Sequence, residues 1–182
     1  MRFPSLPDTA PLSAVFAAFP ATIPALTGYI EAVMRAPGTL DIAERELIAA
    51  YVSAGNACTF CYGSHVIYAE AFGIEKGLIE ALVADLESAP LAPRMKTLLG
   101  YVARLQHPPA RYKQTDLDAV LDAGWPEAAV FEAVQVAALF HMMNRIVEGT
   151  GVTFDPLTNR AAHPASRLGN RAREHSFVKT AE

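Results

Sequence analysis

Cysteine is scarce in this sequence: its 182 residues include only two, Cys58 and Cys61. They stand two residues apart, so a disulfide between them needs little movement of the backbone, and the chain has no third cysteine for another internal pairing. In a reducing cytosol, such a C-x-x-C pair is more often catalytic or metal-binding than a structural disulfide. The function of the protein is therefore expected at this pair.

A strong charge of one sign is also missing, as is a long apolar run. The net charge of −4 and the isoelectric point near 5.7 give no reason to expect a nucleic acid partner. No run approaches the ~20 apolar residues of a membrane span. The opening MRFPSLPD places prolines and an acid where a signal peptide needs an apolar stretch. We therefore expect a cytoplasmic protein with neither nucleic acid nor membrane as its partner.

Helical periodicity is present nearly throughout. Hydrophobic residues make up 52% of the chain, and alanine and leucine recur every three or four residues without sustained strand-like alternation. The predicted fold is all-α, a compact helical bundle. We expect one domain over residues 1–155 with a proline-rich N-terminal segment. Residues 156–182 form a polar, basic tail, either disordered or ordered as an arm against a neighbouring subunit.

Local signals place the helices along the chain. Asp41 and Glu44 have the spacing of a capping box, Gly73 suits a left-handed C-cap, and Gly149 suits the end of the last helix. The predicted helices span residues 22–35, 41–54, 58–73, 75–86, 93–106, 115–123 and 126–148.

The cysteine pair is followed by His65. If a helix begins near Cys58, then Cys58, Cys61 and His65 occupy positions i, i+3 and i+7 and share one face. The first turn of a helix favours a thiolate at Cys58. His65 stands four residues after Cys61, close enough to take or deliver a proton.

Glu46 lies on the preceding helix, twelve residues before Cys58. Its face carries the small residues Ala49, Ala50 and Ser53, so another helix can approach closely there. We predict that desolvation raises the pKa of Glu46 and suits it to proton shuttling near neutral pH. We predict that Glu46, and not Glu44, faces the thiols, and that Glu44 caps its helix.

Two other interpretations of the cluster stay open. Cys58, Cys61, His65 and Glu46 would make four zinc ligands, although structural zinc sites usually contain a second C-x-x-C or H-x-x-x-H pair, which this chain lacks. The two cysteines would alternatively be inert core residues, because free cysteine is among the most buried residue types.

Two stretches carry a resemblance to a known family. The segment SAGNACTFCYGSH at 53–65, preceded by Arg45-Glu46, is similar to the alkylhydroperoxidase D-like branch of the carboxymuconolactone decarboxylase superfamily, and closest to its peroxidase-related enzymes. The segment FHMMNRIVEGTGV at 140–152 resembles the Asn-Arg helix end of that group. The resemblance covers roughly residues 38–155.

The resemblance implies a compact, all-helical subunit that assembles into trimers or hexamers. It also implies a peroxidase that uses the cysteine pair with neither haem nor metal, so no cofactor is expected. Cys61 would attack the peroxide and become a sulfenic acid, and Cys58 would resolve it to a disulfide. Glu46 and His65 would relay protons, and a lipoyl-like or thioredoxin-like dithiol would reduce the disulfide.

The chain departs from the best-characterised family members between the cysteines. Where those proteins carry a second histidine, this chain has Thr59-Phe60. Phe60 either lines an apolar pocket for an organic hydroperoxide or packs as a core aromatic. Helix position favours Cys58 as the more acidic thiol, whereas the resemblance implies that Cys61 attacks first.

Two other functions and several other residues need weighing. The alternatives are a lactone decarboxylase, which does not need a dithiol, and a non-enzymatic oligomeric redox sensor or scaffold.

His141 on the apolar run 134–143 is interpreted as a buried core or interface residue, and Asn144 as structural. His163 and His175 lie in the tail without an identifiable partner.

Overall fold

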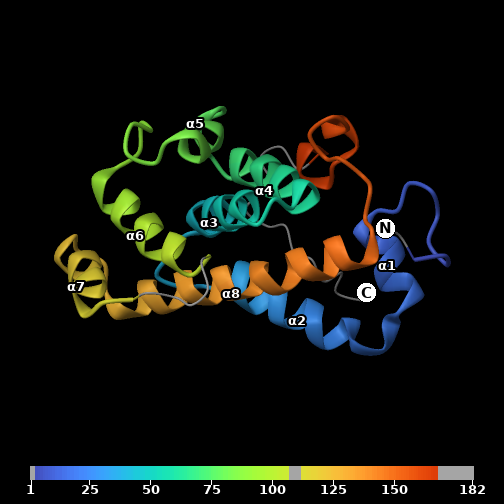
Figure 1. The fold of residues 1–182 in the computed structure, drawn as a ribbon, viewed down its shortest axis with the longest axis horizontal. Helices are drawn as coiled ribbons and strands as arrows, with labels where there is room; N and C mark the ends of the chain where they lie inside the picture. Colours follow the sequence, from blue (N-terminus) through green and yellow to red (C-terminus); the bar gives the residue numbers. More distant parts are fainter. Residues whose placement is uncertain (1–2, 107–111, 168–182) are drawn as a thin grey trace.

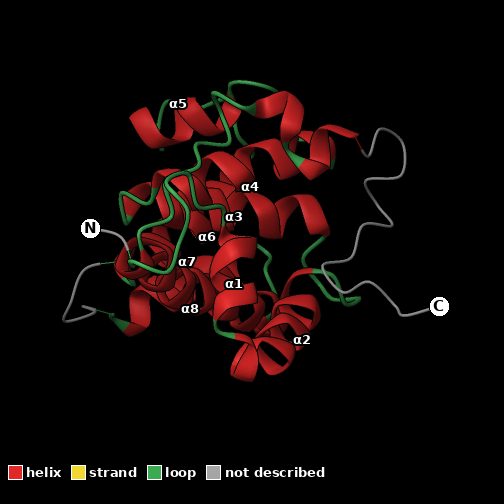
Figure 2. Ribbon diagram, turned by 90° about the vertical axis from the view of Figure 1, so that its right-hand side faces the viewer, coloured by secondary structure: helices red, strands yellow, loops and turns green. Residues whose placement is uncertain are grey.

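The computed structural model describes residues 3–106 and 112–167. Within these ranges the chain is all helical, as its periodicity predicts, with eight α-helices and no strand (Figures 1 and 2). The helices are α1 (Leu12–Ala18), α2 (Ile23–Met34), α3 (Ile42–Gly55), α4 (Thr59–Ala71), α5 (Leu78–Ala84), α6 (Pro93–Arg104), α7 (Gln114–Asp122) and α8 (Glu127–Thr150), with short 3-10 turns η1 (Pro20–Thr22), η2 (Arg160–Ala162) and η3 (Pro164–Arg167).

Helix α3 occupies the middle of the molecule. It packs against α4 over most of its length and also contacts α8, α5 and α6. Figure 1 shows α8 as the longest helix, with α2 running beside it and the α3–α4 pair on its other side. The small side chains of Ala49, Ala50 and Ser53 are fully buried, so the close helix approach predicted for this face is confirmed.

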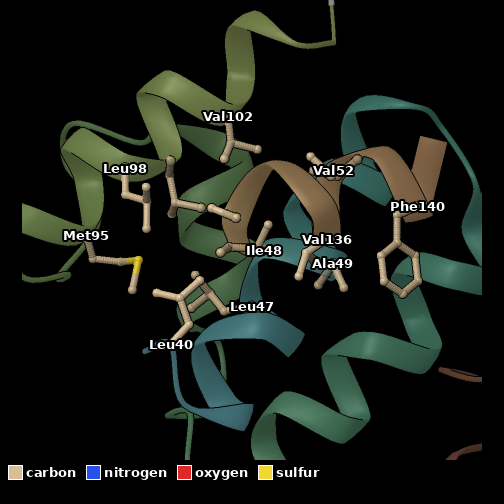
Figure 3. Packing of buried hydrophobic residues seen from close by; sticks show 14 of the residues in the cluster. Leu40, Leu47, Ile48, Ala49, Val52, Met95, Leu98, Val102, Val136 and Phe140 are labelled. Atoms are coloured by element: carbon tan, nitrogen blue, oxygen red, sulfur yellow. The ribbon is translucent and has the colours of Figure 1, made fainter. Parts of the chain in front are cut away.

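The core is built mainly by α3, α6 and α8. Figure 3 shows Ile48 and Val52 of α3 among side chains contributed by neighbouring helices, including Leu98 and Val136. Because almost every residue from 45 to 53 is buried, α3 is a central helix surrounded by others. Any polar side chain on it must find its partners inside the protein.

The ends of the helices follow the local signals with one exception. The Asp41 side chain accepts from the Glu44 backbone while the Glu44 carboxylate accepts from the Asp41 backbone, which confirms the capping box. Gly73 has a φ of 110°, as its C-cap role predicts. The prediction that Gly149 ends the last helix is wrong. The helix continues to Gly151, whose φ of 79° supplies the left-handed turn.

Helix α8 is long and apolar enough to cross a membrane by length and composition. Half of its most apolar stretch is buried inside the molecule, which is the pattern of a core helix in a globular protein.

The first part of the tail, residues 156–167, lies against α4 of its own chain (Figure 1). Arg160 forms an ion pair with Glu70 of α4. The approach is close at Gly63, because an added Cβ would lie 3.0 Å from Cγ of Leu157 and that side chain would have to shift by a few tenths of an ångström. The remaining tail residues, 168–182 with His175 among them, lie outside the described part of the chain.

Candidate functional site

The two cysteines stand at the junction of α3 and α4. Cys58 is the N-cap of α4, and Cys61 lies in the first turn. The preceding residue, Ala57, has a φ of 55°, a left-handed conformation that costs a non-glycine residue roughly 1–2 kcal/mol. Both cysteines are buried free thiols, packed together against Val147 of α8. The structure thus brings the pair together at a strained turn.

The pKa values of the two thiols are shifted in opposite directions. A hydrogen bond from the Cys61 thiol lowers the pKa of Cys58, with burial opposing the shift. The same hydrogen bond, together with burial, raises the pKa of Cys61 far above its ordinary value. Of the two thiols, Cys58 is therefore the more acidic, in agreement with the expectation from helix position.

Helix α8 faces the thiols with two polar side chains one turn apart. The Asn144 amide opposes the shift at Cys61 by lowering its pKa, and the Glu148 carboxylate raises the pKa of Cys58. Asn144 is fully buried and is oriented by two further bonds. It accepts from Asn56 at 2.7 Å and donates to Ser53 at 3.1 Å. The interpretation of Asn144 as structural therefore missed its effect on Cys61.

Glu46 and His65 are in direct contact, one helical turn of α4 beyond Cys61. Oε2 of Glu46 lies 2.5 Å from Nδ1 of His65, and its Oε1 lies 2.5 Å from a guanidinium nitrogen of Arg35. Burial raises the pKa of Glu46, but the charges of His65 and Arg35 and their hydrogen bonds outweigh it and lower the pKa overall. The prediction of a raised pKa at Glu46 is therefore wrong, because it counted the desolvation but not the two cationic partners.

Arg35 was not anticipated as part of the site. It is the C-cap of α2, and its guanidinium lies over the rings of Tyr68 and Phe72, 5.5 and 5.1 Å from their centroids. No motif in the sequence marks it. Only the packing of α2 against the α3–α4 pair places this cation beside Glu46.

A cavity of about 470 Å³ opens beside the cysteines. Cys61 and His65 both line it, whereas Cys58 is not among its lining residues. Most of its other walls are apolar or aromatic. They include Phe16, Ile30, Phe60, Tyr68, Phe140, Met143 and Phe154. Of the two interpretations of Phe60, the structure favours a place on the wall of an apolar cavity.

The tail supplies one wall of this cavity through His163. Its Nε2 lies 2.8 Å from Oγ of Ser64 on α4, and its ring packs edge-on against Tyr68. The expectation that His163 lacks a partner is therefore wrong, because the tail folds back onto α4. His141 is half-buried and its Nδ1 lies 2.9 Å from Nδ2 of Asn56, outside the cavity lining.

Metal binding at the cluster receives no support from the geometry. Over residues 3–106 and 112–167, no three histidine, cysteine, aspartate or glutamate side chains are grouped so as to hold a metal ion. Glu46 is instead engaged by Arg35 and His65, so it does not face the two thiols as a fourth ligand would.

Sequence comparison finds a family model that matches part of this architecture. The model of the carboxymuconolactone decarboxylase family matches residues 20–104, which include α2, α3 and α4 with Glu46, Cys58, Cys61 and His65. The parts of the cavity that come from α1, α8 and the tail lie outside the matched region. Residues 20–104 are similar to the carboxymuconolactone decarboxylase family. A search of curated proteins found no significant match.

Solved structures agree with the family fold. A peroxidase-related protein from Ralstonia eutropha JMP134 with an alkylhydroperoxidase AhpD core has a TM-score of 0.73 at 21% identity, covering 78% of this chain and 75% of its own. A peroxidase-related protein from Silicibacter sp. TM1040 has a TM-score of 0.72 at 25% identity, covering 78% and 74%. The debrominase Bmp8, in complex with 2,3,4-tribromopyrrole, has a TM-score of 0.68 at 14% identity, covering 81% and 78%. These three solved structures share the helical arrangement described above.

Proposed function

We propose that this protein is a cysteine-based peroxidase that reduces hydrogen peroxide or organic hydroperoxides through a Cys58–Cys61 dithiol and disulfide cycle. The observation that carries the proposal is the position of Cys61. It contacts a second free thiol on one side and lines an apolar cavity with His65 on the other. The peroxidase-related names of the structural relatives support the same chemistry.

The first half of the proposed cycle begins with a proton shift inside the pair. Cys61 passes its proton to the Cys58 thiolate as peroxide enters the cavity, and the Asn144 amide stabilises the new Cys61 thiolate. The Cys61 sulfur then attacks the terminal oxygen of R–O–O–H, so that an S–O bond forms and the O–O bond breaks. Cys61 is oxidised to a sulfenic acid, and the alkoxide RO⁻ takes a proton to leave as the alcohol.

The dyad of His65 and Glu46 is suited to supply that proton. Nδ1 of His65 is hydrogen-bonded to Glu46. Nε2 of His65 is therefore the ring nitrogen available to the cavity that this residue lines. Arg35 balances the carboxylate charge and keeps Glu46 ionised. The dyad then resembles other catalytic histidines oriented by a carboxylate.

The second half closes the disulfide. Cys58 loses its proton, for which the Glu148 carboxylate beside it is a suitable acceptor, and attacks the sulfur of the Cys61 sulfenic acid. An S–S bond forms and water leaves. A lipoyl-like or thioredoxin-like dithiol then reduces the disulfide and is itself oxidised. We further propose a cytoplasmic homo-oligomer, a trimer or hexamer, without nucleic acid or membrane partners.

The direct test is peroxide consumption by the reduced protein with dihydrolipoamide as donor. Hydrogen peroxide and cumene hydroperoxide are compared, and Cys61→Ser serves as the control. Multiple turnovers that disappear in Cys61→Ser would support the proposal. A wild-type protein that forms and re-reduces its disulfide without consuming peroxide would instead favour the oligomeric redox sensor.

A lactone decarboxylase, the activity in the family name, is less well supported by the cavity. Its substrate would carry carboxylates, yet among the described lining residues there is no lysine or arginine to bind them. Decarboxylation of a γ-carboxylactone that survives in the Cys58→Ser/Cys61→Ser double variant would favour this alternative.

A reductive dehalogenation is a second candidate, because the aromatic cavity suits a flat ring and Bmp8 is a debrominase. The dithiol would supply two electrons, converting Ar–Br to Ar–H and bromide while Cys58 and Cys61 become a disulfide. Bromide release from 2,3,4-tribromopyrrole, measured with the same donor and the same Cys61→Ser control, tests it.

A further inference from the structure

Ser64 and His163 form a second polar pair beside the cysteines. Ser64 follows Cys61 by three residues on α4, and His163 comes from the tail ninety-nine positions away. Both side chains line the cavity and are at least nine-tenths buried. In small-molecule sites, a few polar groups placed in a mostly apolar wall fix the orientation of the ligand.

The hydrogen bonds of His163 decide what Ser64 can do. Its Nδ1 accepts from the backbone N–H of Ala165 at 3.2 Å, and a backbone N–H is always a donor. Nδ1 therefore carries no proton, and in the neutral ring the proton resides on Nε2. Nε2–H then donates to Oγ of Ser64 at 2.8 Å.

This arrangement excludes a serine nucleophile. A histidine that activates serine must accept its proton at the ring nitrogen facing the hydroxyl, whereas Nε2 of His163 already bears one. Ser64 instead accepts one hydrogen bond and keeps its own O–H proton. Among the described residues, no other hydrogen-bond partner of the Ser64 side chain is found.

We propose that the Ser64 hydroxyl, held by His163, is the hydrogen-bond donor that orients an organic hydroperoxide with an aryl or branched alkyl group in this cavity. The inference rests on the proposed function and adds its substrate class. The carbon-bearing oxygen accepts from Ser64, the terminal oxygen faces Cys61, and the hydrocarbon group lies among the aromatic walls. A volume of about 470 Å³ is within the range of small-molecule sites and far larger than hydrogen peroxide requires.

Ser64 and His65 then act on the same oxygen from adjacent positions. When the Cys61 sulfur takes the terminal oxygen, negative charge develops on the carbon-bearing oxygen. The Ser64 hydroxyl stabilises that charge by a hydrogen bond, and the proton that completes the alcohol comes from His65. Ser64 remains protonated throughout, so the atoms balance as in the step described above.

Binding of unreactive analogues tests the site without any turnover. The probes are cumyl alcohol, which keeps the oxygen, and cumene, which lacks it. The proteins are the wild type, Ser64→Ala, His163→Gln, His163→Leu and, as the matched control on the same tail, Ser166→Ala, whose exposed hydroxyl lies outside the cavity lining. Dissociation constants are measured by ligand-observed NMR on the reduced protein.

We expect Ser64→Ala to weaken cumyl alcohol binding roughly fivefold, the effect of losing one hydrogen bond, and to leave cumene binding unchanged. His163→Gln, which keeps a donor, should retain more affinity than His163→Leu, and Ser166→Ala should match the wild type. Equal losses for both probes in Ser64→Ala, or no binding of cumyl alcohol to the wild type, would overturn the inference. Selective binding of cumyl alcohol without peroxide turnover would support the Ser64 binding site and contradict the proposed peroxidase function instead.

Discussion

Nδ1 of His65 lies 2.5 Å from Oε2 of Glu46, between the two central helices α3 and α4. Arg35 binds the other carboxylate oxygen, so the Glu46 charge is compensated from both sides although its side chain is completely buried. The ring of His65 also packs edge-on against Phe140. These contacts fix the orientation of the imidazole that lines the cavity, which leads to the first two predictions.

Replacing Glu46 by Gln should slow peroxide turnover by about two orders of magnitude, the range of general acid–base contributions. The Gln amide is neutral, so it cannot stabilise a positive charge on the His65 imidazole or orient the ring as the carboxylate does. The measurement is kcat/KM for cumene hydroperoxide between pH 5 and 8. Glu44→Gln is the matched control on the same helix, since Glu44 caps α3. Equal rates for the two variants would show that Glu46 has no part in the reaction.

Replacing Arg35 by Met should lower the free energy of unfolding by about 3 kcal/mol at pH 7, because Glu46 would lose one partner of a buried ion pair. The pKa of Glu46 is lowered in the folded protein, so its contribution is present above the ordinary pKa of 4.5 and is lost as the pH falls through the folded pKa. The difference between the two proteins should therefore shrink as the pH falls below about 4.5.

Urea unfolding at pH 7, 5 and 4 measures this difference. Arg104→Met serves as control, because Arg104 pairs with Asp116 while its side chain is 48% exposed, and exposed pairs contribute less than about 1 kcal/mol. A loss in Arg35→Met as small as that of the control would contradict the role of Arg35.

We predict that the order of attack follows from access to the cavity and not from acidity. The hydrogen bond between the thiols lowers the pKa of Cys58, but only Cys61 lines the cavity. One equivalent of peroxide should therefore produce a sulfenic acid on Cys61 in Cys58→Ser, detected by dimedone labelling and mass spectrometry. Efficient labelling of Cys58 in Cys61→Ser, with none in the reciprocal variant, would reverse the assignment.

Asn144→Ala should slow alkylation of Cys61 by iodoacetamide several-fold, because the amide that lowers the pKa of Cys61 is removed. The rate is measured in the Cys58→Ser background. The change also leaves Ser53 and Asn56 without a buried partner, with an expected loss of about 1–3 kcal/mol in stability. Asn159→Ala, on the exposed surface of the tail, controls for the loss of an amide. An unchanged alkylation rate would restore the structural interpretation of Asn144.

Ala57→Gly should raise the free energy of unfolding by up to about 1 kcal/mol, because glycine adopts the φ of 55° without the steric cost paid by alanine. Ala119→Gly, on the exposed face of α7, should do the opposite and cost about 1 kcal/mol. Denaturant midpoints compare the two variants. Destabilisation of both would mean that Ala57 stores no strain next to Cys58.

The order and class of the helices could be predicted because their signals are local. The capping box of Asp41 and Glu44 and the positive φ of Gly73 depend on neighbours within a few residues, and both are found in the structure. The end of the last helix was misplaced at Gly149, since either of two nearby glycines fits the local pattern and only Gly151 adopts the left-handed conformation. The roles assigned to Glu46, Cys58, Cys61 and His65 stay predictions until the variants are measured.

What the sequence by itself determined was the helical scaffold, the family resemblance and the short-range spacing of two thiols and one imidazole on α4. Only the tertiary structure decided which distant side chains reach them. Arg35, Asn144 and His163 come from α2, α8 and the tail, and of the three only Asn144 lies in a stretch that the family resemblance marks. The direction of the pKa shift at Glu46 shows the physical reason. Burial is predictable from helical periodicity, but the sign of a buried charge's pKa shift depends on which opposite charges the fold brings within a few ångströms.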